Sequence, residues 1–156
     1  MEPPSPNQAD LPRESRRPKL PLGRVVVGID GSAGSRQALV WAADYATATG
    51  VEVALVIAWH YPAMYGEVGL PAFDFEADSR KVVDQLVTEF RASYPEVVFS
   101  TEVVRTRAAE ALIQASGDAR LLVVGSRGHG AFASMLIGSV SIHCVQHAAC
   151  PVVVVR

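Results

Sequence analysis

Short apolar runs alternate along this chain with segments whose apolar residues recur every three or four positions. The runs are rich in valine, isoleucine and leucine, which is typical of strands buried on both faces. They predict five strands, over residues 25–29, 51–58, 97–104, 121–124 and 152–155. The segments between them predict helices, two ending at Gly50 and before Pro95 and two spanning residues 108–116 and 139–147.

This order of elements predicts an α/β fold. Strands that alternate with helices form a parallel sheet, because each right-handed crossover returns the chain to the same end of the sheet. We therefore expect a single domain with a five-stranded parallel sheet and helices on both faces. Ligands of such sheets bind beyond the carboxyl ends of the strands, where the strand order reverses. Asp30, Ala58 and Gly125 each lie at such an end, so we expect them to line one crevice.

The first 22 residues differ in composition from the rest of the chain. Their prolines are interleaved with charged residues, and they contain few large apolar side chains. Such a segment buries too little apolar surface to offset the entropy lost on ordering. We therefore predict a disordered proline-rich tail over residues 1–22 and a folded domain over residues 23–156.

The overall composition narrows the classes of function. A chain of 156 residues with 49% hydrophobic residues and a net charge of −2 suits a globular domain and offers no basic surface for nucleic acid or an anionic membrane. Its apolar runs are far shorter than the about 20 residues of a membrane span. No secretory signal is visible. We expect a cytoplasmic protein with neither a nucleic-acid nor a membrane partner.

Two glycine clusters in the last third of the chain point to an anion site. Gly125-Ser126-Arg127-Gly128 directly follows a predicted strand, and Gly138-Ser139 precedes the last predicted helix. Glycine lets the backbone approach a ligand closely, and a helix N-terminus offers unpaired amides to an anion. Together they predict a phosphate site. The segment lacks the lysine of a Walker A loop, and its glycine order differs from the dinucleotide-binding GxGxxG fingerprint.

The spacing Gly125-x2-Gly128-x9-Gly138-Ser139 resembles the G-x2-G-x9-G-[S/T] signature of the ATP-binding branch of the universal stress protein family. The similarity extends over residues 24–156 and includes Asp30-Gly31-Ser32 after the first strand and Cys150-Pro151 before the last. It implies an adenine nucleotide alpha hydrolase-like, Rossmann-like fold. It also implies an ATP-binding, nucleotide-responsive homodimer that acts in stress adaptation or signalling.

The resemblance implies a role for each motif residue. Asp30 would hydrogen-bond the ribose hydroxyls or help to hold a phosphate-bound Mg²⁺, and the adenine would lie near Ala58. The residues implied to wrap the triphosphate are Gly125, Ser126, Gly128, Gly138, Ser139, Val140 and Ser141. For Arg127 we leave two positions open, against a phosphate or in solvent.

Some of these residues also have a purely structural interpretation. Asp30 suits a turn or a helix cap, Ser139 suits a helix N-cap, and Gly138 suits a loop position with positive φ. His129 is expected on the loop surface. His143 and His147 share one helical face, but no third ligand stands near them in the sequence, so we do not expect a metal site there.

The residues near the glycines predict nucleotide binding without catalysis. They include no Walker lysine, no clear general base and no nucleophile paired with a base. Three alternatives remain: a slow ATPase with a metal held by Asp30, a binder of cyclic AMP or another adenine nucleotide, and a scaffold for a protein partner that needs no nucleotide. We also expect bound phosphate to order residues 129–137.

The last predicted strand, Val152–Val155, is apolar throughout. At the edge of a sheet, such a strand recruits another chain because its outer backbone groups lack partners. A two-fold dimer that pairs two copies of this strand antiparallel would satisfy those groups. The family resemblance implies the same homodimer.

Overall fold

The computed structural model describes residues 23–61, 74–129 and 137–156. The elements in chain order are β1 (Arg24–Ile29), α1 (Ala33–Thr49), β2 (Val53–Trp59), α3 (Phe75–Ser93), β3 (Phe99–Arg105), α4 (Ala108–Ala115), β4 (Ala119–Gly125), α5 (Ser139–His147) and β5 (Val152–Val155). They confirm the predicted α/β fold, with strand bounds that differ from the predicted ones by at most two residues. The predicted tail over residues 1–22 and residues 130–136 of the predicted loop lie outside the described ranges.

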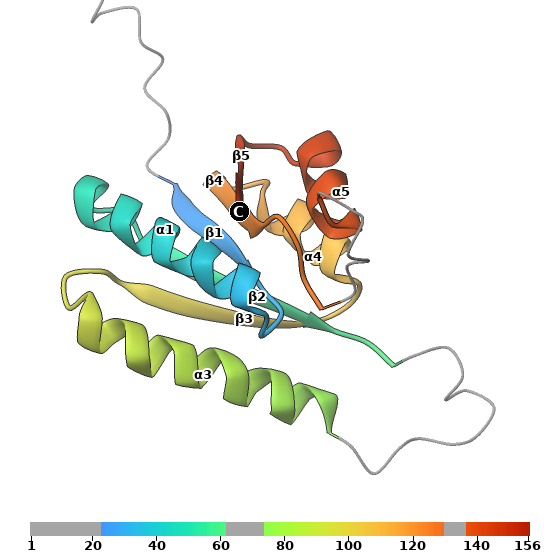
Figure 1. The fold of residues 1–156 in the computed structure, drawn as a ribbon, viewed down its shortest axis with the longest axis horizontal. Helices are drawn as coiled ribbons and strands as arrows, with labels where there is room; N and C mark the ends of the chain where they lie inside the picture. Colours follow the sequence, from blue (N-terminus) through green and yellow to red (C-terminus); the bar gives the residue numbers. More distant parts are fainter. Residues whose placement is uncertain (1–22, 62–73, 130–136) are drawn as a thin grey trace, which may run out of the picture.

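The five strands form one parallel sheet in the order β3-β2-β1-β4-β5. Figure 1 shows the sheet between two pairs of helices, with α1 and α3 on one side and α4 and α5 on the other. Alternate residues of β1 serve the two sides: Val25 and Val27 pack with α1 and α3, and Val26 packs with α4 and α5. All three are fully buried, which explains why the strand is apolar at consecutive positions.

Helix α1 begins and ends at well-defined caps. The hydroxyl oxygen of Ser32 accepts a hydrogen bond from the amide of Ser35 at 3.2 Å, and Gly50 ends the helix with a φ of 71°. Its buried face is made mostly of alanine: Ala38, Leu39, Ala42, Ala43 and Ala46. Small side chains on this face let the helix axis lie close to the sheet.

The first turn of α1 also touches the end of β4 through backbone atoms alone. A Cβ atom on Gly125 would lie 2.6 Å from the carbonyl carbon of Gly34 and 2.7 Å from its oxygen. A Cβ atom on Gly34 would overlap the carbonyl oxygen of Arg127. Neither position has room for a side chain, so this contact requires both glycines.

The strand order reverses beside β1. The chain leaves β1 through α1 toward β2 on one face, and it returns through α4 to β4, the other neighbour of β1, on the opposite face. The carboxyl ends of β1 and β4 are therefore flanked by helices that diverge to opposite faces, which leaves an opening at this edge. No helix within the described ranges is long and apolar enough to cross a membrane.

The contact between α1 and β4 predicts that Gly34→Ala destabilises the fold. Alanine is favoured over glycine in a helix by about 1 kcal/mol, but here its methyl group must displace the backbone of Arg127. We expect the free energy of unfolding, measured by urea denaturation, to fall by about 1–3 kcal/mol, as is usual for overpacked sites.

Gly117→Ala is the matched control, because its Cβ would meet only the carbonyl oxygen of Gln114 at 3.4 Å. We expect its unfolding free energy to stay within about 0.5 kcal/mol of wild type. Equal stabilities for the two variants would contradict the packing argument.

Candidate functional site

A cavity of about 610 Å³ lies at the carboxyl ends of β1, β2 and β4. Its volume is within the range of small-molecule sites, about 300–1,000 Å³. It lies at the reversal of strand order, as the predicted sheet topology required. The residues lining it come from three strands, from α1 and α4, from His60 after β2, and from the segment between β4 and α5 together with the first turn of α5.

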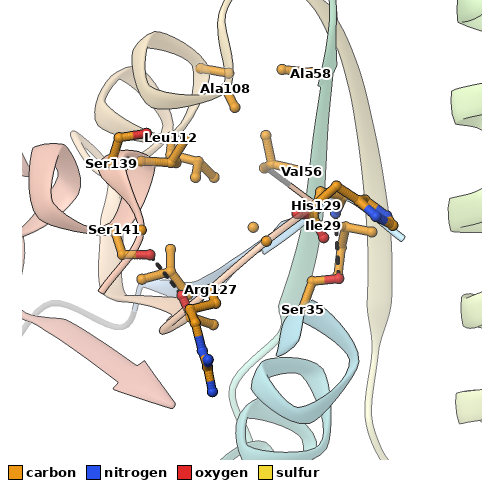
Figure 2. A pocket seen from close by; sticks show the side chains of 18 of the residues that line it. Ile29, Ser35, Val56, Ala58, Ala108, Leu112, Arg127, His129, Ser139 and Ser141 are labelled. Atoms are coloured by element: carbon orange, nitrogen blue, oxygen red, sulfur yellow. Dashed lines mark hydrogen bonds between the residues drawn. The ribbon is translucent and has the colours of Figure 1, made fainter. Parts of the chain in front are cut away.

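One end of the cavity is aliphatic. Figure 2 shows Ala58 of β2 and Ala108 of α4 facing each other at this end, with Val56 and Leu112 beside them. The floor beneath is Gly28 of β1, where a Cβ atom would lie 2.9 Å from a methyl carbon of Leu112. This end can take a flat apolar group, and it offers that group mostly carbon atoms.

The other end holds Asp30, directly after β1. One carboxylate oxygen of Asp30, Oδ1, accepts a hydrogen bond from the amide of Ser32 at 2.9 Å. Its second oxygen, Oδ2, faces Gly128 so closely that a Cβ atom on Gly128 would overlap it. The turn interpretation of Asp30 is therefore correct, and the same carboxylate also lines the cavity.

Asp30 is ionised at neutral pH. Partial burial alone would raise its pKa. Hydrogen bonds from Ser32 and Ser35 and the nearby imidazole of His129 outweigh that effect and lower the pKa of Asp30 below its ordinary value of 3.8. The cavity therefore presents a stable negative charge beside the glycine-rich segment, where a ribose hydroxyl or a metal ion can meet it.

Three hydrogen bonds hold the segment between β4 and α5. The amide of Ser126 donates to the carbonyl oxygen of Val155 at 2.6 Å, and the amide of Gly138 donates to that of Ser126 at 2.7 Å. The hydroxyl of Ser141 donates to the carbonyl oxygen of Gly125 at 2.7 Å (Figure 2). These bonds bring the two predicted glycine clusters together on one wall of the cavity.

Backbone donors on this wall point to an anion. The amides of Arg127, Gly128, Ser139 and Val140 make no hydrogen bond to any other described residue. The last two belong to the first turn of α5, whose amides have no partner within the helix. Unpaired amides from two neighbouring segments form the kind of concave donor surface that binds phosphate groups.

Two structural interpretations of this wall were wrong. Gly138, and not Ser139, is the N-cap of α5, so Ser139 is its first residue and makes no cap hydrogen bond. Gly138 has a φ of −72° and a ψ of 156°, which any residue adopts, so its glycine is not explained by a positive φ. A Cβ atom there would lie 3.5 Å from the carbonyl oxygen of Ser126, an ordinary contact.

The cavity brings together nearly all of the residues predicted from the motif. The lining includes Asp30, Ala58, Gly125, Arg127, Gly128, Gly138, Ser139, Val140 and Ser141. Ser126 is buried and lies outside the lining, and its backbone anchors the wall through two hydrogen bonds. The Arg127 side chain extends away from Ala58 and Ala108 in Figure 2. His129 is exposed, as expected, yet it also lines the cavity mouth.

Sequence reasoning missed other lining residues. His60 and Val56 flank Ala58 at a spacing of two, the period that keeps strand residues on one face, so that alternation was an available signal. Gly28 gave no signal, because its contacts are with Leu112 and Val124, far along the chain. Within the described ranges, no group of three or more His, Cys, Asp or Glu residues is placed to hold a metal ion.

The universal stress protein family model matches residues 21–156 of the chain. Universal stress protein Rv2005c of Mycobacterium tuberculosis is 40% identical over 135 residues, which cover 85% of this chain and 45% of that protein. The chain thus spans about half the length of the curated relatives it matches.

Solved structures share the fold. Universal stress protein UspA from Lactobacillus plantarum gives a TM-score of 0.75 at 20% identity, covering 86% of this chain and 98% of that one. A universal stress protein in complex with cAMP gives 0.65 at 23% identity, with 86% and 97% covered. The universal stress protein from Archaeoglobus fulgidus in complex with dAMP gives 0.61 at 20% identity, with 86% and 98% covered.

The lowered pKa of Asp30 predicts a pH-dependent contribution to stability. A carboxylate whose pKa is lower in the folded state stabilises the fold above its unfolded pKa, here about 3.8, and that stabilisation is lost as the pH falls through the folded pKa. We expect Asp30→Asn to be less stable than wild type in urea at pH 7, by a difference that shrinks below pH 3.8.

Asp84→Asn on α3 is the control, because the Asp84 carboxylate has no hydrogen bond or ion pair with another described residue. We expect its unfolding free energy at pH 7 to stay within about 0.5 kcal/mol of wild type. An NMR titration that places the carboxyl midpoint of Asp30 above 3.8 would overturn the assignment.

Proposed function

This chain belongs to the universal stress protein family, and we propose that it binds ATP in the cavity between β1 and β4 as a nucleotide-responsive homodimer in stress adaptation. The adenine lies at the aliphatic end, near Ala58 and Ala108. The phosphates lie against the unpaired amides between β4 and α5. Asp30 meets the ribose hydroxyls or a Mg²⁺ ion held by the phosphates, since Mg²⁺ prefers carboxylate and phosphate oxygens.

The observation that carries this proposal is that nothing in the described chain requires a glycine at position 138. Neither its dihedral angles nor its contacts within the described chain require glycine. A Cβ atom there would nevertheless lie 4.0 Å from the amide nitrogen of Gly128, beside one of the unpaired donors. A group that approaches this amide from the cavity explains why the position has no side chain.

The adenine nucleotide is supported by relatives. The solved complexes of two family members contain cAMP and dAMP, which share the adenine base and a phosphate. The number of unpaired amides in the wall favours a chain of phosphates over one, since Arg127, Gly128, Ser139 and Val140 each offer a donor. For these reasons we prefer ATP, and a direct comparison of ATP, ADP and cyclic AMP by calorimetry, with and without Mg²⁺, tests the choice.

Slow hydrolysis of ATP is the second candidate. Asp30 and His129 lie together at the phosphate end, so a carboxylate and an imidazole stand near the proposed phosphates. No lysine lines the cavity in the described part of the chain, which favours storage or sensing over rapid turnover. Turnover above background that is lost in Asp30→Ala would establish the ATPase.

Gly138→Ala distinguishes an effect on ligand binding from an effect on folding stability. The new methyl group fits the protein, so we expect unfolding free energy within about 0.5 kcal/mol of wild type. It also blocks the approach to the Gly128 amide, and the loss of one charge-assisted hydrogen bond costs about 1.5–3 kcal/mol. We therefore expect ATP affinity, measured by calorimetry, to fall about 10- to 100-fold.

Gly117→Ala again serves as the control, because Gly117 lies outside the lining of the cavity. Its ATP affinity should match wild type. Unchanged ATP affinity in Gly138→Ala, together with unchanged stability, would refute the proposal that phosphates bind the amides beside Gly138.

The proposed homodimer uses the free edge of β5. In the described sheet β5 pairs with β4 alone. The carbonyl oxygens of Pro151 and Val155 accept hydrogen bonds from the β4 side, so by alternation the amide of Val154 points outward. Antiparallel pairing of two β5 strands would satisfy these outward groups.

Val154→Pro tests this interface, because proline removes the outward donor and is tolerated where no bond within the sheet is lost. We expect wild type to sediment at twice its 16.6 kDa mass and Val154→Pro at the monomer mass. Val154→Ala keeps the amide and should remain dimeric. A wild-type chain that sediments as a monomer with ATP bound would contradict the dimer.

A further inference from the structure

Gly28 lies in the interior of β1, and the backbone there does not require glycine. Within the described residues, positive φ angles occur at Gly31 and Gly50, and Gly28 pairs with Val56 of β2 in regular parallel register. Glycine inside a strand gives up packing and conformational entropy, and it commonly marks a place where another group approaches the backbone closely. The reason for this glycine is therefore to be found in what packs on the sheet at this point.

The group that packs there is the side chain of Leu112 on α4. A Cβ atom on Gly28 would lie 2.9 Å from one methyl carbon of Leu112, Cδ1, and 3.3 Å from the other, Cδ2. It would also lie 3.4 Å from a methyl carbon of Val124, which is close to an ordinary contact. Leu112 itself is buried. Its methyl carbons thus occupy the space that a side chain at position 28 would need.

The contact of Leu112 with Gly28 forms part of the cavity wall, because both residues line the cavity. Helix α4 contributes two alanines to the lining, Ala108 and Ala111, and it contributes Leu112. Leu112 is therefore the lining residue of this helix whose side chain is longer than a methyl group. Figure 2 shows it on the same side of the cavity as Ala108, with Val56 of β2 across from it. The length of the Leu112 side chain thus sets how much of the cavity is open between α4 and the sheet.

Helix α4 is fixed to its surroundings, so a crowded Leu112 moves through its side chain. The helix ends at Ser116, whose hydroxyl oxygen accepts a hydrogen bond from the amide of Ala149 at 2.8 Å. This bond ties the end of α4 to the segment that follows α5. A methyl group added at Gly28 would therefore be accommodated by rotation of the Leu112 side chain. The open space next to both residues is the cavity, so that rotation narrows it.

We propose that Leu112 is a specificity-determining residue of the nucleotide site, and that its two methyl carbons, seated over Gly28, limit how large a base the aliphatic end accepts. The proposal rests on the proposed function and adds the permitted size of the base. An unsubstituted adenine fits beside Leu112, whereas a base with a further apolar group directed at α4 is rejected. In an apolar pocket, one methylene too many or too few changes discrimination about 10- to 200-fold.

The first test adds a methyl group to the wall and then removes the carbon atoms it meets. We expect Gly28→Ala to bind ATP about 10-fold more weakly than wild type by calorimetry, with a similar midpoint of urea unfolding, because the displaced atoms end a flexible side chain beside open space. Leu112→Val removes both Cδ atoms and one carbon overall. The double variant Gly28→Ala/Leu112→Val therefore keeps the carbon count of wild type, and we expect it to recover most of the lost ATP affinity.

Leu39→Val is the matched control for a buried leucine. Leu39 is fully buried on α1 and lies outside the cavity lining. Its replacement should lower the unfolding midpoint, as Leu112→Val does, but it should neither change ATP affinity nor rescue Gly28→Ala. Unchanged ATP affinity in Gly28→Ala, or an equal loss with and without Leu112→Val, would overturn the role of Leu112.

The second test measures the size limit directly. It uses ATP derivatives that carry a methylthio or benzyl group on the base, at C2, C8 or N6. We expect wild type to bind them more weakly than ATP, and we expect Leu112→Val to bind at least one of them about 10-fold more tightly than wild type does. No gain for any derivative would overturn the size limit while leaving the nucleotide site standing. A wild-type chain that binds no adenine nucleotide would overturn the site itself, and the role of Leu112 with it.

Discussion

The contact of Gly34 with Gly125 and the Arg127 carbonyl is the constraint on which the site depends. It places the first turn of α1 directly on the end of β4, with no side chain between them. The turn before α1 carries Asp30, and the segment after β4 carries Gly128, so the same contact brings that carboxylate and that glycine together. If either glycine gained a side chain, the two segments would separate and the polar end of the cavity would widen.

The division of the cavity into an aliphatic end and a polar end follows from the sheet topology. Parallel strands bring their carboxyl ends to one edge, and the reversal beside β1 opens that edge between α1 and α4. Strand β2 and helix α4 supply small and branched aliphatic side chains, since their inner faces continue the core formed by Val26, Leu122 and Val124. The segments that follow β1 and β4 are turns, and they supply a carboxylate and free backbone amides. A ligand with an apolar ring and a charged tail matches this division.

Much of the fold was predictable from the sequence. Each strand is apolar over its buried length, and in each helix apolar residues recur every three or four positions. The glycine spacing also located the cavity wall that carries the unpaired amides. The reasons assigned to single glycines were less accurate. Gly125 was expected to admit a ligand, yet packing against Gly34 already requires it, and Gly138 was given a conformational alternative that its φ of −72° rules out. The contact that requires Gly125 joins residues about 90 positions apart, which no local pattern reveals.

The proposed nucleotide site and the proposed dimer edge share a backbone residue. Ser126 accepts a hydrogen bond from the amide of Gly138 and donates one to Val155, the last residue of β5. A phosphate bound to the amides beside Gly138 acts on one side of Ser126, and the position of the edge strand acts on the other. Both hydrogen bonds of Ser126 are short, at 2.7 and 2.6 Å, so the wall and β5 are held closely to this residue. A change in the wall would therefore reach β5 through the single residue Ser126, which would give the proposed nucleotide-responsive homodimer a direct physical route.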